Sequence, residues 1–380
     1  MKKRLFTPGP TPVPEHVLLT MAEPIIHHRH PEFRELFERL SKNLQYLFQT
    51  SQDVISLTSS GSGSMEAAVV NLLSPGDTAI TVNGGKFGER WGELCRANGV
   101  NAVEIAVEWG TAVTADEIVE SIKAHPETKA VFVTHSETST GVAIDVKTIA
   151  QAVRANSGAV FVVDGITAVG ALEMRMDEWG LDVVVTGSQK GLMIPPGLAF
   201  IALSEKAWKL VESSHCHRYY FDLLKARKSL KGNDTPWTPA TTLLIGVDVA
   251  LEMIRKETLE KVWERHSRLA AAVRAGVQAL GLRLLAKSPS NALTAIWNPE
   301  VPDVKVFNNA LKKKYGITVA GGQGHLKDKI FRISHLGYYD ELDVLSVIGA
   351  VELSLRDAGY VFEPGAGVKA AQTVFLNESW

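Results

Sequence analysis

The stretch that decides the fold is VVVTGSQK, residues 183–190. Three consecutive valines without polar alternation are typical of a strand covered on both faces, as in a parallel sheet packed between helices. Small and polar residues follow the valines and end at Lys190. Ligands of an open α/β sheet collect at the carboxyl ends of its strands. The stretch therefore predicts an α/β protein with a ligand site near Lys190.

Similar apolar runs lie on both sides of this stretch, at residues 78–82, 130–134, 159–163 and 198–202. Helical periodicity appears between the runs, for example at 146–156, and also before them at 32–48. This pattern predicts a large domain with a mostly parallel central sheet covered by helices.

The pattern changes after about residue 245. A helical stretch at 239–279 is followed by elements that do not alternate strictly: runs at 293–297 and 330–334, and helices at 306–315 and 340–358. This order predicts a smaller α+β domain. We expect the tail, 365–380, to be loosely ordered.

Four prolines, at positions 8, 10, 12 and 14, disfavour helix and ladder pairing near the N-terminus. We therefore predict an extended arm at 1–15, a large domain at 16–258 and a small C-terminal domain at 259–380. The arm is expected to pack near the small domain.

Composition excludes several classes of protein. The 380 residues are 45% hydrophobic, and 40 basic against 42 acidic residues give a net charge of −2, which is unlike a disordered chain or a nucleic-acid binder. Two cysteines form no disulfide framework and indicate a reducing compartment. No apolar run approaches the roughly 20 residues needed to cross a bilayer. A cytoplasmic location without membrane partners is expected.

Two residues at strand ends carry groups suited to covalent chemistry. Burial of Lys190 beside the apolar residues that follow it would lower its pKa and favour a neutral, nucleophilic amine. Asp164 ends the run at 159–163, and a carboxylate there could stabilise a protonated ring nitrogen. The alternatives are an exposed lysine in a turn and an aspartate that caps a helix.

Three further features point to anion or ring binding. Residues 59–66, SSGSGSME, enter a predicted helix whose N-terminus favours a phosphate, although a serine-capped turn explains them equally well. Phe87 follows another strand and could lie over an aromatic ring or simply pack. Arg332 stands inside an apolar run, so its guanidinium needs either a ligand carboxylate or an internal ion pair.

Other site types find little support. The segment His27-His28-Arg29-His30 has no accompanying cysteine or carboxylate at ligand spacing, so no metal is predicted. Its role is left open. The chain has neither a Gly-x-Ser-x-Gly elbow nor a Walker lysine, which disfavours a serine hydrolase of the common type and an NTPase.

Seven short segments occur in order along the chain: TPGP at 7–10, GSGSMEAA at 61–68, NG at 83–84 with FGER at 87–90, HSETSTG at 135–141, VDGI at 163–166, GSQK at 187–190 and FRI at 331–333. Together they resemble the class V aminotransferases of pyridoxal 5′-phosphate (PLP) fold type I. The likeness is strongest to the alanine–glyoxylate, serine–glyoxylate and serine–pyruvate aminotransferases.

The resemblance implies a role for each matching residue. Lys190 would hold PLP as a Schiff base and carry a proton during catalysis, and Asp164 would pair with the pyridinium nitrogen. Phe87 would stack on the ring, where relatives often have the larger tryptophan. Further contacts would come from Ser62, Gly63, Ser64 and Gln189 at the phosphate, Thr138 at the ring hydroxyl side and Ile166 beneath the ring.

The resemblance also implies a substrate clamp and a shared site. Arg332 would bind the substrate carboxylate, with the Gly9 backbone nearby. Thr238, or Thr241 if the register differs, would reach the phosphate of a neighbouring subunit, so the protein would be a homodimer with two-chain active sites. The arm would then lie across the partner.

The implied activity is transfer of an amino group from L-alanine or L-serine to glyoxylate or pyruvate. An aminophosphonate–pyruvate transaminase remains an alternative, with the segment 25–30 as its anion pocket. A cysteine desulfurase or selenocysteine lyase of the same fold is disfavoured, because no cysteine follows Cys216. A PLP-fold subunit or small-molecule binder without catalysis is the alternative outside enzymes.

Overall fold

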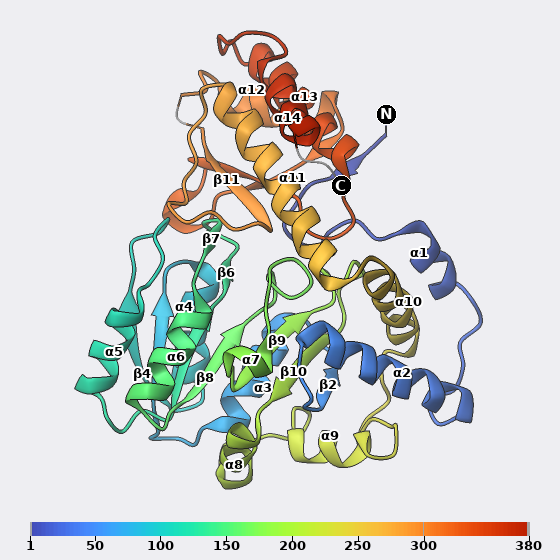
Figure 1. Ribbon diagram of the computed structural model, residues 1–380, viewed down its shortest axis with the longest axis vertical. Helices are drawn as coiled ribbons and strands as arrows, with labels where there is room; N and C mark the ends of the chain where they lie inside the picture. The colour runs from blue at the N-terminus through green and yellow to red at the C-terminus, as the bar shows by residue number, and fades with distance from the viewer. Residues whose placement is uncertain (1, 299, 378–380) are drawn as a thin grey trace.

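A seven-stranded sheet forms the lower part of the molecule in Figure 1. The computed structural model describes residues 2–298 and 300–377. The strands lie in the order β2 (Val54–Leu57), β10 (Ala199–Leu203), β9 (Val183–Gly187), β8 (Val160–Asp164), β5 (Ala130–Thr134), β3 (Thr78–Asn83) and β4 (Asn101–Ala106). Only β10 runs against its neighbours. The predicted mostly parallel sheet is confirmed.

Alternate side chains of the strands enter two different cores, as a strand buried on both faces requires. In β5, Val131 and Val133 belong to one cluster, and Ala130 and Phe132 to the other. The apolar runs therefore mark the strands well: β5 matches its run residue for residue, β9 begins at Val183 as the opening stretch does, and β8 and β10 each lie one residue further along.

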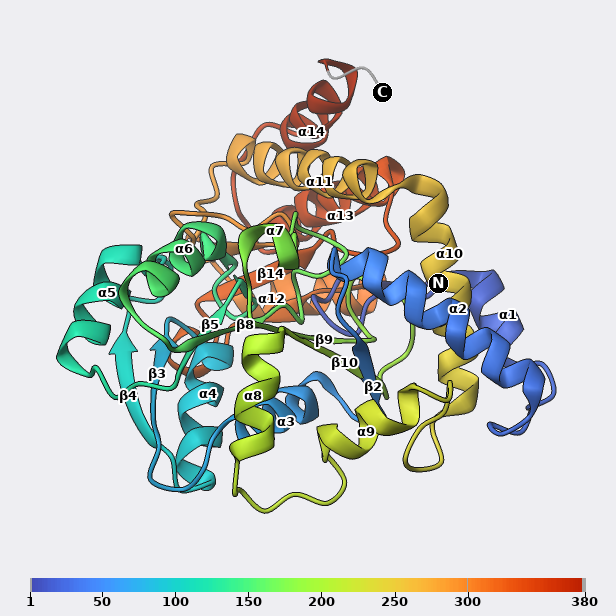
Figure 2. The ribbon, with the colours of Figure 1, turned by 60° about the horizontal axis from the view of Figure 1, so that its bottom comes forward.

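Helices cover both faces of the sheet, as Figures 1 and 2 show from two sides. One face carries α2 (Pro31–Phe48), α5 (Ala115–Ala124), α6 (Val146–Asn156) and α7 (Met176–Trp179). The other carries α3 (Gly61–Leu72), α4 (Lys86–Ala97), α8 (Glu205–Ser213) and α9 (Leu223–Leu230). The helices predicted at 32–48 and 146–156 are confirmed.

The predicted helical stretch at 239–279 is two helices, α10 (Thr241–Glu257) and α11 (Leu259–Ala279). Thr258 between them has a φ of 71°, a left-handed conformation that ends α10 and redirects the chain. Apolar periodicity continues through the break, so the sequence pattern alone did not reveal it.

The C-terminal part is built on a three-stranded antiparallel sheet in the order β11 (Leu293–Trp297), β14 (Ile330–Ser334) and β13 (Ala320–Gly321). Around it lie α12 (Val304–Asn309), a π-helical turn at Ala310–Lys314, a 3-10 turn at Gly324–Leu326, α13 (Glu341–Asp357) and α14 (Ala366–Asn377). The expectation of a loosely ordered tail was wrong for 366–377, because Ala371 and Phe375 of α14 are buried in the C-terminal core.

The N-terminal arm packs on its own chain. Strand β1 (Arg4–Leu5) pairs in parallel with β12 (Ile317–Thr318), and Phe6 stacks on Tyr339 at 5.2 Å. The chain then runs without regular structure to α1 (Glu15–Met21). Within one chain, the contacts of residues 4–11 join the C-terminal part to the large sheet. The expected contact of the arm with a partner subunit stays a prediction.

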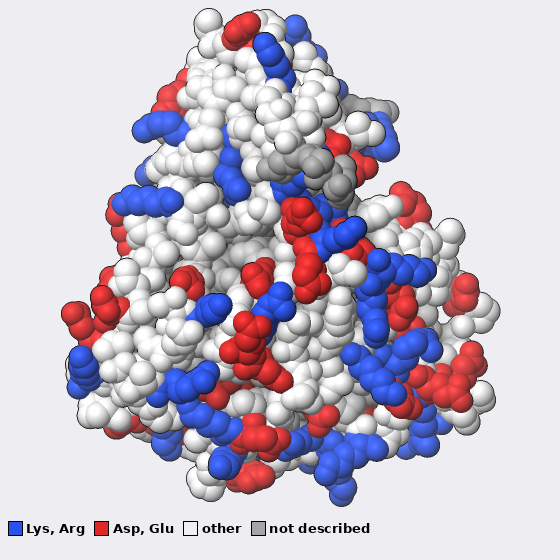
Figure 3. All heavy atoms as spheres, viewed as in Figure 1, with Lys and Arg blue, Asp and Glu red and all other residues white. Residues whose placement is uncertain are grey.

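Charges of both signs are mixed on the face shown in Figure 3, in keeping with the near-neutral composition. Within the described ranges, no helix combines the length and the apolar character needed to span a bilayer.

Candidate active site

The polar strand ends meet at the carboxyl edge of the sheet. Thr134 at the end of β5 pairs with Asp164 at the end of β8, and Asp164 pairs with Val185 of β9. The segment 188–190 follows β9 directly. The structure thus brings together the segments that the sequence placed at three strand ends, as the geometry of a parallel sheet requires.

Lys190 is a buried lysine with 8% of its surface exposed. Its amine donates a hydrogen bond to the carbonyl of Pro8 in the arm. Burial lowers the pKa of this amine to about 8, and the nearby Arg332 acts in the same direction, whereas Asp164 opposes the shift. At pH 7, one unit below this pKa, roughly a tenth of Lys190 is neutral, which is the form that a nucleophilic amine requires.

Gly9 lies directly against the lysine side chain. Its φ is +150°, and a Cβ at this position would stand 2.5 Å from Lys190 Cε, closer than real contacts allow. Thr11 anchors the same turn, since its backbone N–H donates to Gln189 O at 3.2 Å and its hydroxyl to Lys190 O at 3.0 Å. The arm therefore covers Lys190 at close range, and glycine is what allows it.

Asp164 is also buried, and burial raises the pKa of its carboxyl to about 7. Its Oδ1 accepts the backbone N–H of Ile166 at 2.8 Å. Among the residues that the structure describes, no hydrogen bond is made to Oδ2. The carboxyl can therefore accept a further cationic N–H, and such a partner would favour its ionised form.

The glycine-rich segment opens α3 beside this carboxylate. Gly61 packs against Ile166, whose Cδ1 would be 2.6 Å from a Cβ on that glycine, and a Cβ on Gly63 would lie 2.5 Å from Ser59 Oγ. Ser62 and Gly63 are half-buried in the first turn of α3, where the Gly63 N–H donates to Ser60 O at 2.8 Å. The hydroxyl of Ser64 is engaged elsewhere: it is fully buried and donates to Gly61 O at 2.8 Å, so only its backbone is free for a phosphate.

Gln189 shows an unmet hydrogen-bonding capacity at the same place. Its Oε1 is buried and finds no hydrogen-bond partner among the described residues. Buried polar atoms are normally paired, and exceptions gather at sites that await a ligand. A Cβ on Gly187 would lie 3.1 Å from Oε1 and 3.3 Å from the backbone N of Gly61, which places the glutamine beside the glycine-rich segment.

Phe87 is held by two residues that the sequence reasoning did not assign. Glu137 accepts the backbone N–H groups of Phe87 at 3.2 Å and of Gly88 at 2.9 Å. Arg90 lies over the Phe87 ring at 5.0 Å and donates to the Ser62 hydroxyl at 3.0 Å. The sequence did hold signals for both residues: Glu137 is an acidic residue shortly after an apolar strand, and Arg90 lies one helical turn after Phe87.

Arg332 lies on the central strand of the C-terminal sheet with 6% of its surface exposed. Its Nε and Nη2 donate to Gly321 O at 3.0 and 2.6 Å, and its Nη1 donates to Thr138 O at 2.8 Å. No ion pair to it is found within the described ranges. A guanidinium has five N–H groups, so two remain, one on each terminal nitrogen.

The side chain of Thr138 is already paired, because its hydroxyl shares a hydrogen bond of 2.7 Å with the Thr167 hydroxyl. Its carbonyl is the acceptor for Arg332. Thr138 thus links the arginine to the strand ends, and Thr167 is a further residue that the sequence did not single out.

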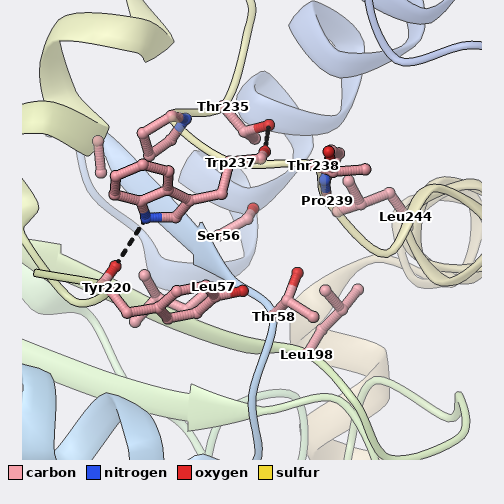
Figure 4. A pocket seen from close by; sticks show the side chains of 12 residues that line it. Ser56, Leu57, Thr58, Leu198, Tyr220, Thr235, Trp237, Thr238, Pro239 and Leu244 are labelled. Carbon is pink, nitrogen blue, oxygen red and sulfur yellow. Dashed lines mark hydrogen bonds between the residues drawn. The ribbon is translucent and has the colours of Figure 1, made fainter.

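Thr238 lies outside this group. It is exposed and borders a hollow shown in Figure 4, together with Thr58, Leu198, Trp237 and Pro239. The lining of that hollow includes neither Lys190 nor Asp164. Thr241 is the buried first residue of α10, and its hydroxyl makes only a long bond of 3.5 Å to Pro239 O. Neither threonine belongs to the site formed within one chain.

The residues of the histidine-rich segment His27-His28-Arg29-His30 are exposed or half-buried. His27 and His28 stack at 4.6 Å, and His30 caps α2. Within residues 2–298 and 300–377, no group of three or more histidine, cysteine, aspartate or glutamate side chains is placed to hold a metal ion.

A sheet covered on both faces, a buried lysine after β9 and an aspartate ending β8 define the architecture of fold type I PLP enzymes of the aminotransferase kind. The solved structure of ureidoglycine–glyoxylate aminotransferase from Bacillus subtilis superposes with a TM-score of 0.93 at 30% identity, and 99% of each chain is covered. The predicted fold class is confirmed.

The chain belongs to the class V aminotransferases, whose family description matches residues 4–344. It is 38% identical over 381 residues to serine–glyoxylate aminotransferase from Hyphomicrobium methylovorum, covering 98% of this chain and 94% of the relative. It is 44% identical over 378 residues, 98% of both chains, to a Synechococcus protein named as the small subunit of a soluble hydrogenase. The predicted enzyme class, an aminotransferase, is confirmed.

Proposed function

We propose that this aminotransferase uses PLP to move an amino group from L-alanine or L-serine to glyoxylate or pyruvate. The observation that carries the proposal is the pairing of a buried, partly neutral Lys190 with a buried Arg332 that keeps two free N–H groups. The first suits a carbonyl cofactor and the second an α-carboxylate. Two relatives named for glyoxylate as acceptor support the choice of 2-oxo acid.

The residues of the site fit PLP. Lys190 Nζ would hold the aldehyde carbon, and the free Oδ2 of Asp164 would accept the ring N–H. Ser62, Gly63, the backbone of Ser64 and the amide NH₂ group of Gln189 would hold the phosphate group. When bound, PLP supplies an electron sink for the bond that is broken at the substrate α-carbon.

Phe87, Thr138 and Ile166 would enclose the ring. Phe87 would stack on it, Ile166 would pack beneath it beside Gly61, and Thr138, whose hydroxyl is shared with Thr167, would lie at the ring hydroxyl side. Asp164, once ionised by its cationic partner, keeps the positive charge on the ring nitrogen.

The chain's own residues would then bind the substrate and move one proton. Arg332 would hold the substrate carboxylate through its two remaining N–H groups, with Gly9 backbone nearby, and so orient the α-carbon. Lys190 Nζ, neutral at that stage, would accept the α-proton and later return a proton. The Pro8–Thr11 turn over Lys190 would limit access of water to that amine.

A cysteine-based activity is less compatible with the structure. Cys95 is fully buried in α4, and burial raises the pKa of its thiol to about 12. Burial also raises the pKa of Cys216. A nucleophilic cysteine needs a lowered pKa. The aminophosphonate alternative would use the segment 25–30, and the donor screen below decides between it and small amino acids.

We further propose that the protein is a cytoplasmic homodimer in which Thr238 or Thr241 reaches the phosphate in the partner's site. The exposed position of Thr238 at the hollow of Figure 4, outside its own site, supports an intersubunit role. We also propose the division into an arm at 1–15, a large domain at 16–258 and a small domain at 259–380, because Thr258 separates the end of α10 from the start of α11.

A donor screen tests the proposal. The purified protein, loaded with PLP, is expected to show a visible absorption band that alanine or serine converts to the pyridoxamine form, and glyoxylate or pyruvate should restore the band. 2-Aminoethylphosphonate serves as the competing donor. Preference for it would overturn the small-amino-acid assignment, and absence of a bound band would overturn the cofactor assignment.

A further inference from the structure

A carboxylate buried beside the site has no role in the proposed function. Glu137 follows β5 in the short strand β6 (Ser136–Glu137), which pairs with β7 (Val142–Ala143). Only 1% of its surface is exposed, and no ion pair to it is found among the residues described. A buried charge without a cation is costly unless hydrogen bonds compensate it, so its partners indicate why it is there.

The partners of Glu137 are backbone and hydroxyl donors from two segments. Oε2 accepts Phe87 N–H at 3.2 Å and Gly88 N–H at 2.9 Å. Oε1 accepts Ser139 N–H at 3.0 Å and the Ser139 hydroxyl at 2.6 Å. Ser139 Oγ in turn accepts Lys86 N–H at 3.0 Å. The carboxylate and its serine therefore bind the first three N–H groups of α4.

This arrangement replaces the usual local cap of a helix. The N-cap residue of α4 is Gly85, which has no side chain to cap with. A Cβ on Gly85 would lie 2.5 Å from Glu137 Cγ, so glycine is what admits the carboxylate. An N-cap normally comes from the same chain segment. Here it comes from a residue 50 positions later, which fixes the start of α4 to the segment 137–139 rather than to its own loop.

That segment also holds the substrate clamp. Thr138, between the two capping residues, accepts Arg332 Nη1 at 2.8 Å through its carbonyl. The ring of Phe87 and the guanidinium of Arg332 are thus both fixed to the same three residues, one through the Glu137 side chain and one through the Thr138 backbone. A change at Glu137 would therefore move the Phe87 ring relative to the Arg332 guanidinium.

We propose that Glu137 is a positioning residue that sets the place of the Phe87 ring, which would stack on the cofactor ring, relative to the Arg332 clamp. The inference rests on the proposed PLP site. Burial raises the pKa of the Glu137 carboxyl, and the hydrogen bonds from Ser139, Gly88 and Phe87 oppose that shift, so the bonds that cap α4 also favour the ionised form of Glu137.

Glu137→Gln tests the role, because the amide NH₂ group would face backbone donors and only one oxygen would remain as an acceptor. In the protein without PLP, hydrogen exchange of the Phe87 and Gly88 amides should be roughly 10-fold faster. With PLP, the dissociation constant should rise roughly 10-fold and the induced circular dichroism of the bound ring should fall. We expect kcat to fall more than the KM for the amino donor changes.

Asp145→Ala is the matched control. Asp145 caps α6 through Thr148 N–H at 3.0 Å, and it belongs to no part of the site. Its loss should lower the unfolding temperature while PLP affinity and the circular dichroism stay at wild-type values. If Glu137→Gln behaves like Asp145→Ala in all these measurements, Glu137 is a helix cap only and the proposal is overturned.

Ser139→Ala provides a milder test should Glu137→Gln fail to fold. It removes one donor to the carboxylate and the acceptor for Lys86. A rise of a few-fold in the PLP dissociation constant with a weaker ring dichroism would support the proposal, and wild-type values would overturn it. If the wild-type protein itself bound no PLP, the proposed function would fail, and the amide exchange rates without cofactor would still report whether Glu137 holds Phe87.

Discussion

Lys190 at the edge of the seven-stranded sheet and Arg332 in the three-stranded sheet are both buried cations, and their surroundings differ. Lys190 has one hydrogen bond to a carbonyl and a pKa of about 8. Arg332 has three such bonds, and burial lowers its pKa only to about 10. The first group can lose its charge near neutral pH and the second cannot. The large sheet therefore carries the amine that we propose to react, and the small sheet carries a cation that stays charged.

The largest effect is expected from Lys190→Ala, which removes the amine and leaves the clamp. Transaminase turnover should fall by at least roughly 10³-fold, because general acid–base catalysis alone contributes about 10²–10⁴-fold. Borohydride treatment should label Lys190 in the wild-type protein and nothing in the variant, as peptide mapping would show. A Lys190→Ala variant with the turnover rate of the wild-type protein would contradict the proposed role of the Lys190 amine.

Arg332→Ala should affect binding instead. Loss of a buried guanidinium that holds a carboxylate is expected to raise the KM for alanine about 100-fold, or ~2.8 kcal/mol, while the PLP absorption band persists. Arg332→Lys keeps the positive charge but loses the two-pronged guanidinium, so its KM for alanine should lie between those of the wild-type protein and Arg332→Ala. Steady-state kinetics across a series of alanine concentrations measures the change. An unchanged KM would remove Arg332 from the clamp.

The pH dependence should separate the two cations. Below about 8 the folded Lys190 is protonated, so the neutral fraction and the rate at which PLP attaches to the cofactor-free protein should fall about tenfold for each unit of pH between 7 and 5. Arg332 stays charged over this range. Stopped-flow absorbance would follow the attachment; the rate should level off above pH 8, and a rate that kept rising tenfold per unit up to pH 10 would contradict the lowered pKa.

The smallest effect is expected from a pair of glycine variants. Gly9→Ala places a methyl group against the end of Lys190 at a φ that disfavours alanine, and PLP affinity should fall roughly 5-fold, about 1 kcal/mol, because the lysine end is flexible. Gly321→Ala is the counterpart beside Arg332, where a Cβ would meet nothing within 4 Å. It should leave both PLP affinity and KM unchanged. PLP titrations of the two variants measure the affinities. Equal losses of PLP affinity would contradict the expectation that only Gly9 lies against a residue that binds the cofactor.

The sequence predicted the sheet well and the connections less well. Strands β5, β11 and β14 and helix α6 were predicted to the residue, because continuous apolar runs and a clear helical period are local signals. The break at Thr258 and helix α14 depend on packing between distant segments, which periodicity does not report. Strands β1 and β12 are two residues long and exist through pairing across the chain.

The site shows the same difference between local signals, which the sequence carries, and contacts between distant segments, which it does not. Lys190, Asp164 and Arg332 were accessible from sequence because each is a charged residue inside an apolar run, at its end or a few residues after it. The engagement of the Ser64 hydroxyl with Gly61 and the role of Glu137 depended on which way side chains point in the folded chain. Sequence identifies the groups that must be explained, and only the fold shows what each one contacts.

The arm also constrains the order of events during synthesis. Phe6 O accepts Ser334 N–H at 2.9 Å, and the Tyr339 hydroxyl donates to Leu5 O at 2.8 Å. These arm residues thus wait for partners that are made more than 300 residues later. Because early segments fold first and such distant contacts close slowly, the turn at Pro8 and Gly9 can settle over Lys190 only near the end of translation. A nascent chain would be unable to retain its coenzyme firmly until then.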